Sequence, residues 1–354
     1  MTASTRPTSL EKIEARKAFY AEIAKQHLAP LWERLGELVT RSPQPGAKPV
    51  HWKYSTVRPD LIAAGSLLSA EEAERRVLIL ENPGLVGQSK ITGSLYAGLQ
   101  LLMPGERAHA HRHTASALRL FLEGSSAYTS VDGERTGMAR GDFVITPAWS
   151  WHDHGNEGPD PVIWLDGLDV PIVNLFDTSF SEGHDETQFP VSRPANDSEA
   201  RYGGTLVPEG CKPESLSSPL LNYRYQRARE SLATLHRNGP IDPCHGVKLR
   251  YVNPLTGGSA MPTMSAAIQL IPRRFETAPY RSTDGTVFVV VEGQGRSYVA
   301  GASFEWAESD VFVVPSWARQ AHRADSEAVL FSFSDRVAQE KLGIWREQRE
   351  MKPS

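Results

Sequence analysis

The stretch PGERAHAHRHTASALRLFLEG, residues 104–124, decides the fold class and points to a chemistry. It contains three histidines at every second position: His109, His111 and His113. Successive side chains of a β-strand point to opposite faces, so these imidazoles are predicted to share one face. The later segment PAWSWHDHG repeats the alternation with His152 and His154. We therefore expect two strands that bring imidazoles to one barrel interior.

This concentration of histidines is typical of a metal site. Five of the 11 histidines lie in the two short segments, and neutral imidazole is a ligand for Fe, Zn, Cu and Ni. The alternative is a set of solvent-facing polar residues on an edge strand. A lone histidine would favour that alternative, whereas five at strand spacing favour the metal site.

A pattern of short strand-like segments occurs twice in the chain. Short apolar runs split by Gly, Pro and Asp begin near residue 91 and return from Met261, which indicates a mainly β protein of the sandwich or barrel type. Three segment pairs recur in the same order: LQLLMPGERA (99–108) with IQLIPRRFET (268–277), LFLEGSSAY (120–128) with VVVEGQGRSY (290–298), and GDFVITPAW (141–149) with SDVFVVPSW (309–317). This order indicates a duplicated domain.

The rest of the chain suggests five segments. Residues 9–40 have helical spacing, interrupted at Pro30, and a short helix with Ser69 as N-cap is expected near residues 69–76. The predicted segments are a helical arm (1–85), a metal-binding module (86–180), a connector with one helix near 223–236 (181–255), a module without metal (256–345) and a tail (346–354).

Composition excludes several classes of function. The chain has 354 residues, 40% hydrophobic and 23% charged, as in soluble globular proteins. Its net charge is −4 and it has no long basic tract, which argues against a nucleic-acid partner. It has no apolar run long enough for a membrane span and no signal-peptide core. Only two cysteines, Cys211 and Cys244, are present, so a reducing cytoplasm is expected.

The histidine segments resemble the two cupin motifs. The first motif corresponds to Gly105, His111, His113 and Gly124, and the second to Gly141, Pro147, His152 and Asn156. This spacing selects His111 over His109. The usual motif glutamate is replaced by Ala117, so the resemblance implies a bicupin with a site of three histidines and no carboxylate.

A three-histidine site has chemical consequences. Three neutral ligands leave a divalent metal with its full charge, which a substrate with two anionic oxygens would neutralise. Three octahedral positions would remain, two for a chelating substrate and one for dioxygen. Iron(II) fits by analogy with other non-heme iron oxygenases, whereas zinc sites with three histidines favour tetrahedral hydrolytic chemistry.

Longer segments across residues 60–345 resemble the gentisate 1,2-dioxygenase family, which includes salicylate and 1-hydroxy-2-naphthoate dioxygenases. The matching segments are ERRVLILENPGL (74–85), YAGLQL (96–101), HRHTASALR (111–119), ITPAWSWHDHGN (145–156), TAPYRSTDGTVFVVVEG (277–293) and LFSFSDR (330–336). The resemblance implies a homotetrameric bicupin with one iron(II) per chain. With O₂, it opens the ring of an aromatic ortho-hydroxy carboxylic acid between the carboxylated and hydroxylated carbons.

The resemblance also assigns residues. It implies His111, His113 and His152 as iron ligands and the following residues as the substrate pocket: Arg119, Arg75, Gln100, Tyr96, His154 and Asp166. Arg119 lies an even number of residues beyond His113, so it is expected on the same face, where its planar fork suits a carboxylate. A rim salt bridge is the alternative for Arg119, and an exposed helix position is the alternative for Arg75. His154 is expected to assist proton transfer, or Asp166 to orient it.

The ring substituents stay open. Tyr96 favours gentisate, with maleylpyruvate as product, over salicylate, 5-substituted salicylates such as nitrosalicylate, and 1-hydroxy-2-naphthoate. In the second module the ligand positions align roughly with Arg281, Thr283 and Gln320, so this barrel is expected to be structural or an oligomer contact. Two other classes of function use the same motif: a non-redox metal-dependent isomerase or decarboxylase, and a non-catalytic binding or storage protein.

Overall fold

The computed structural model describes residues 9–350, and the chain divides into two units, residues 1–44 and residues 45–354. The first unit holds two helices, α1 (Ser9–Ala24) and α2 (Leu31–Leu38), and no residue of either helix is buried. The interruption at Pro30 is confirmed, because Pro30 is the N-cap of α2. No described helix is both long and apolar enough to cross a bilayer.

The second unit begins with elements that lead into a first barrel. Ser69 caps the short helix as predicted, since its side chain accepts a hydrogen bond from the Glu72 amide at 3.1 Å. The sequence analysis missed α3, whose start lacks a favourable N-cap residue and which contains Pro59. The leading elements are β1 (Val50–Trp52), α3 (Tyr54–Leu67), α4 (Ala70–Ala73) and β2 (Val77–Ile79).

The first barrel consists of two facing sheets with the strand orders β12-β8-β5-β10-β3-β2 and β11-β4-β9-β6-β7. Its turns need glycine: Gly124 has a φ of +97°, and a Cβ there would lie 2.6 Å from Val162 Cγ1. The main elements are β3 (Tyr96–Leu102), β4 (Arg107–His113), β5 (Ala117–Glu123), β6 (Ala127–Val131), β7 (Glu134–Met138), β8 (Phe143–Thr146), β9 (His152–Asn156), β10 (Val162–Leu168) and α5 (Val170–Leu175).

The second barrel repeats this arrangement, with the orders β1-β19-β16-β21-β14-β13 and β18-β17-β20-β15-β22. The connecting elements are β11 (Ser181–Gly183), α6 (Asp197–Tyr202), β12 (Asn222–Tyr223) and α7 (Tyr225–Asn238). The barrel elements are β13 (Val247–Arg250), β14 (Ser265–Ile271), β15 (Tyr280–Ser282), β16 (Thr286–Glu292), β17 (Gly295–Val299), β18 (Ala302–Trp306), β19 (Val311–Val314), β20 (Gln320–Ala324), β21 (Ala328–Ser334), α8 (Arg336–Lys341) and β22 (Glu347–Arg349).

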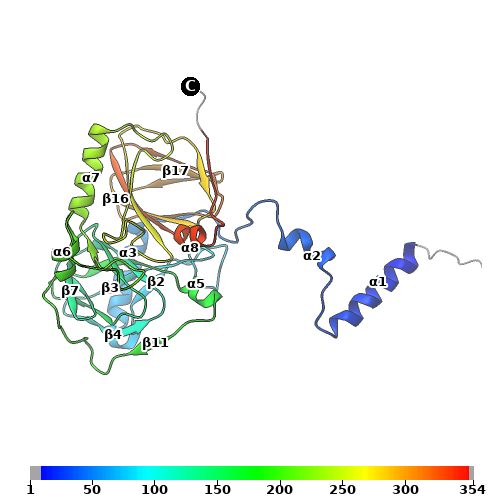
Figure 1. Cartoon of the computed structure of the whole chain (residues 1–354), viewed down its shortest axis with the longest axis horizontal. Helices are drawn as coiled ribbons and strands as arrows, with labels where there is room; N and C mark the ends of the chain where they lie inside the picture. Colours follow the sequence, from blue (N-terminus) through cyan, green and yellow to red (C-terminus); the bar gives the residue numbers. More distant parts are fainter. Residues whose placement is uncertain (1–8, 351–354) are drawn as a thin grey trace, which may run out of the picture. The chain divides into compact units, whose positions relative to one another are not determined.

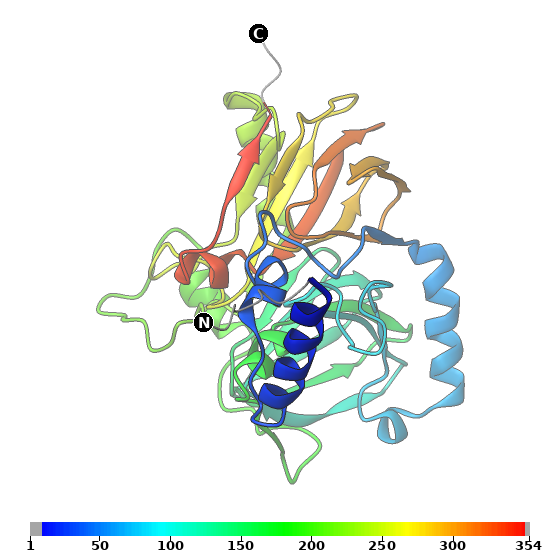
Figure 2. The same ribbon diagram turned by 90° about the vertical axis from the view of Figure 1, so that its right-hand side faces the viewer.

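The two barrels are joined by exchanged strands and a shared core. β1 pairs with β19 of the second barrel, and β12 of the connector pairs with β8 of the first. One buried apolar cluster contains residues of both barrels, and Phe143 and Phe331 meet in it with ring centroids 5.4 Å apart. Figure 1 and Figure 2 show the strands of the second barrel, yellow to red, above the cyan and green strands of the first.

The duplication extends to the helices that precede each barrel. The Tyr54 hydroxyl on α3 donates to Glu123 at 2.7 Å, and the Tyr225 hydroxyl on α7 donates to Glu292 at 2.5 Å. The mainly β, duplicated architecture is therefore confirmed. The five segment boundaries stay a prediction, and β1, β2, β12 and β13 lie in the ranges assigned to the arm and the connector.

Candidate metal centre and pocket

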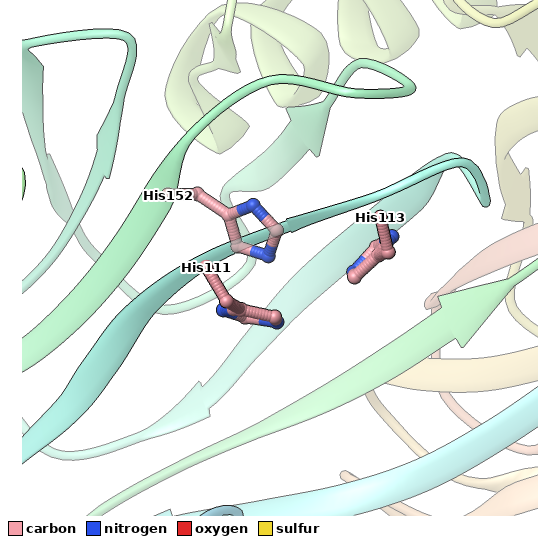
Figure 3. A group of neighbouring side chains, drawn as sticks. All are labelled: His111, His113 and His152. Carbon is pink, nitrogen blue, oxygen red and sulfur yellow. The ribbon is translucent and has the colours of Figure 1, made fainter. Parts of the chain in front are cut away.

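Three imidazoles converge inside the first barrel. His111 and His113 lie on β4, and His152 lies opposite His111 at the start of β9. The candidate ligand atoms of the three histidines all lie within 4.8 Å of one another, and Figure 3 shows the rings turned toward a common centre. Among the described residues this group contains no carboxylate, and Ala117 is buried at the start of β5.

The backbone orients two of these rings. His152 Nδ1 lies 2.9 Å from the Ser150 carbonyl, and His113 Nδ1 lies 2.8 Å from the Ala115 carbonyl. A carbonyl only accepts, so each Nδ1 donates and each Nε2 keeps its lone pair. Nε2 of His152 is buried and has no hydrogen-bond partner among the described residues. Such fixed tautomers with free Nε2 lone pairs fit a divalent metal ion.

Electrostatics keep the three rings neutral. Burial, together with the Arg75 guanidinium, lowers the pKa of His111 to about 2. Burial lowers the pKa of His113 and takes that of His152 well below its ordinary value. Neutral imidazole is the form that binds metals, so the site is ready for a cation near neutral pH.

His109 is not part of this group, which corrects the expectation that three histidines share one face. The pairing of β4 with β9 shifts its register between Ala108 and His111, as in a β-bulge. A bulge inserts an extra residue and changes which side chains face inward. His109 is exposed, and its carbonyl accepts a hydrogen bond from Arg75 at 2.6 Å.

All nine residues predicted for the site line one cavity of about 330 Å³. Arg75 lies just beyond α4, is half-buried and contacts His111 through its guanidinium, so it is not an exposed helix residue. Gln100 is buried with its Nε2 unpartnered. Tyr96 lines the cavity, and burial raises its pKa, so its hydroxyl stays protonated and can donate.

Arg119 and Asp166 form a buried ion pair in the wall of the pocket. Nε of Arg119 lies 3.3 Å from Asp166 Oδ1, and Nη1 donates to the Thr146 hydroxyl at 2.5 Å. Both side chains are less than 10% exposed, so Arg119 does not form a rim salt bridge. Burial raises the pKa of Asp166 to about 6, although Arg119 opposes the shift.

His154 faces the same cavity as His152 but has a different partner from the one expected. Its Nδ1 lies 3.0 Å from the Thr129 hydroxyl, and Asp166 instead accepts from the Trp164 indole at 3.0 Å. Burial lowers the pKa of His154 well below its ordinary value. Sequence reasoning missed Thr129, Thr146 and Trp164, because only the pairing of distant strands brings them beside the pocket.

In the second barrel, two of the three residues predicted at the ligand positions do not stand there. Tyr280 stands opposite Gln320 as His111 stands opposite His152, so Tyr280 and Ser282 replace the two β4 histidines. The predicted positions Arg281 and Thr283 are each off by one residue, and in a strand a shift of one residue places the side chain on the other face. Arg281 instead lies over the Trp317 ring at 4.6 Å. Gln320 pairs with Val299 as His152 pairs with Val131, so the prediction of Gln320 is confirmed.

Comparison with known proteins places this geometry in context. The cupin domain family model matches residues 98–169. Gentisate 1,2-dioxygenase 1 of Aquipseudomonas alcaligenes is 56% identical over 94% of this chain and 96% of its own length. 5-aminosalicylate 1,2-dioxygenase of Comamonas is 36% identical over 94% of this chain and 89% of its own length. The crystal structure of salicylate 1,2-dioxygenase from Pseudoaminobacter salicylatoxidans with gentisate superposes with a TM-score of 0.91 at 33% identity, covering 99% of this chain and 98% of that one.

Proposed function

The chain belongs to the gentisate 1,2-dioxygenase family of ring-cleaving dioxygenases, and we propose that its own substrate is gentisate and its metal iron(II). The product would be maleylpyruvate. The observation that carries the proposal is a three-histidine group without a carboxylate, beside two arginines in one cavity. A site with this charge suits a substrate that brings two anionic oxygens, as an ortho-hydroxy carboxylate does.

The proposed metal ligands are His111, His113 and His152. Their support is the convergence of the three rings, the carbonyls that fix two tautomers, and the unpartnered Nε2 of His152. Bound iron(II) supplies the coordination of substrate and dioxygen on which the family's ring cleavage depends. The ligands hold one iron per chain, because the second barrel has Tyr280, Ser282 and Gln320 at the corresponding positions.

The proposed role of Arg119 is to bind the substrate carboxylate. Its Nη1 donates to Thr146, and its Nε lies 3.3 Å from Asp166 without forming a hydrogen bond, so Nε and Nη2 remain as donors for a ligand. Arg75, a half-buried residue of the same cavity, provides a second positive charge, and Gln100 offers an amide donor. These contacts fix the orientation of the ring with respect to the three histidines.

Three side chains have proposed roles in proton transfer or in binding the ring substituents. His154 is neutral and accepts a proton at Nε2, because the Thr129 hydroxyl donates to Met138 Sδ and therefore accepts from His154 Nδ1. Asp166 holds Arg119 in place, and it exchanges a proton near its pKa of about 6. The protonated Tyr96 hydroxyl provides a hydrogen bond for the second ring hydroxyl of gentisate, which supports gentisate over unsubstituted salicylate.

We also propose that the chain forms a homotetramer. The observation that favours self-association is the first unit, whose helices bury no residue and expose Phe19, Trp32, Leu35 and Leu38 to solvent. Exposed apolar surface of this kind marks interaction sites. Sedimentation of the full chain should give the mass of four chains, and a monomer at micromolar concentration would contradict the proposal.

The function is tested with iron-loaded enzyme in an oxygen electrode. Gentisate should consume one O₂ per molecule and give the absorbance of a ring-opened product, faster than salicylate, 5-aminosalicylate or 1-hydroxy-2-naphthoate. Full iron occupancy without oxygen uptake on any of the four acids would rule out the dioxygenase activity. A higher kcat/KM for another acid of the panel would refute gentisate alone.

A further inference from the structure

The second barrel encloses a cavity of about 410 Å³ in the place where the first barrel has its pocket. Two register relations establish the correspondence. Tyr280 takes the place of His111, and Ser332 takes that of Asp166, because it lies opposite Ala267 as Asp166 lies opposite Gly98. A barrel kept only as support would have its interior filled by side chains, whereas this volume is within the range of ligand pockets, about 300–1,000 Å³.

A lysine enters this cavity from the edge strand. Lys248 on β13 pairs with Gln269 as Val77 on β2 pairs with Gln100. The second barrel therefore carries an ammonium where the first has an apolar side chain. Phe288 takes the place of Arg119, and Lys248 Nζ lies 6.0 Å from the centre of its ring. A ring thus stands in the place of Arg119, and the cations that line this cavity are Lys248 and Arg250 on the edge strand and Arg336.

Among the described residues the ammonium group has no ion-pair partner. Lys248 is an exposed residue of the edge strand and lines the cavity, as does Asp284. Desolvation by neighbouring protein atoms lowers its pKa, and Asp284 opposes this shift. Among residues 9–350 no carboxylate forms an ion pair with it. The Asp284 carboxylate accepts from the Trp345 indole at 2.8 Å and from Thr286 at 3.4 Å.

The other walls combine hydroxyl groups with rings. Ser282, Ser332 and Ser334 line one part of the cavity, and the rings of Phe288 and Tyr280 line another. An ammonium without an ion-pair partner can form a charge-assisted hydrogen bond to an anion that binds beside it in the cavity. The serine hydroxyls of the cavity offer hydrogen bonds to carboxylate oxygens, and the aromatic walls offer apolar contact to a ring.

We propose that the second barrel is a metal-independent binding site for a small one-ring carboxylate, with Lys248 as the anchor for the carboxylate. The site is separate from the metal centre, and the proposal does not rest on the function proposed above. It replaces the expectation that this module serves only as support or as an oligomer contact.

The test is equilibrium dialysis of the full-length, iron-loaded protein with labelled benzoate under anaerobic conditions. Benzoate lacks the ortho hydroxyl, so it cannot chelate the metal. We expect one equivalent per chain whose affinity falls about tenfold or more in Lys248→Met, the loss expected for a charge-assisted hydrogen bond. The matched control is Lys212→Met, an exposed lysine outside the cavity, which should retain this equivalent.

Two further measurements separate binding from folding and from catalysis. Lys248→Met should melt close to the wild type, since Lys248 is exposed and forms no ion pair with the described residues, and its kcat/KM should be unchanged. Lys248→Arg, which keeps the charge, should retain binding. Absence of a benzoate equivalent that depends on Lys248 would overturn the proposal. Displacement of that equivalent by inorganic phosphate at equal concentration would assign the site to inorganic oxyanions and overturn the carboxylate.

Discussion

Replacing Arg119 with methionine tests the proposed anchor for the substrate carboxylate. The guanidinium is 4% exposed and lies between Asp166 and Thr146, so methionine fills most of the volume but removes the charge. A hydrogen bond to a charged group contributes about 1.5–3 kcal/mol. At about 1.4 kcal/mol per decade, kcat/KM for gentisate should fall roughly ten- to a hundredfold. Lysine should not restore it fully, because an ammonium lacks the planar fork.

The same change has a separate effect on stability. Removing one partner of a buried ion pair costs about 3–5 kcal/mol when the remaining charge stays buried. The pKa of Asp166 is already near 6 with Arg119 present, so without the arginine the carboxyl takes up a proton and part of that cost disappears. The double variant Arg119→Met with Asp166→Asn removes the remaining charge. Its melting temperature should recover, whereas its kcat/KM should not.

Steady-state oxygen uptake, metal analysis and thermal melting together decide the matter. Iron content should stay at the wild-type value, because Arg119 is not a proposed ligand. The matched control is Arg107→Met on β4, which is exposed and bonded to Gln188 at 2.7 Å outside the pocket, and its kinetics should be unchanged. If Arg119→Met kept normal kcat/KM, the arginine would not bind the substrate. If the double variant recovered activity together with stability, Arg119 would have only a structural role.

Three further predictions concern the metal and the buried carboxyl. Alanine at His111, His113 or His152 should abolish iron binding and activity, while His109→Ala should retain both; a ligand variant with stoichiometric iron and normal turnover would remove that residue from the site. Elemental analysis should find at most one iron per chain, and two tightly bound metals would contradict the assignment of the second barrel. The folded protein favours protonated Asp166, since its pKa is raised from 3.8 to about 6, so its ionisation weakens stability as pH rises through that range. The stabilisation of Asp166→Asn over the wild type should therefore grow by about 2 kcal/mol between pH 4 and pH 7 in urea unfolding, and a constant difference would contradict the raised pKa of Asp166.

The metal group could be predicted from the chain because its signal is local. The spacing of His111 and His113 from Gly105, and of His152 from Gly141, places imidazoles on paired strands. Because side chains alternate along a strand, His111 and His113 then share one face. The repeated segments likewise predicted two barrels, since each repeat carries the turn glycines and apolar runs of one barrel. Pocket residues such as Arg119 and Gln100 followed from the family resemblance.

Contacts that depend on the pairing of distant strands could not be read in this way. The register shift between Ala108 and His111 turns His109 outward, although its position in the alternation placed it with the other histidines. The same one-residue sensitivity made Arg281 and Thr283 wrong, because a shift of one residue exchanges the two faces of a strand. The local sequence does not indicate the register in either strand, because the register depends on the pairing with the partner strand.

Electrostatic partners and the second cavity belong to tertiary structure for the same reason. Asp166 binds Arg119 rather than His154 because β5 and β10 are neighbours in the sheet, with these two residues directly opposite each other. Lys248 faces a cavity because β13 forms the edge of a sheet whose central strands lie tens of residues later. The motif spacing determines which side chains can hold a metal, whereas the packing of strands far apart in the chain determines what each charge meets.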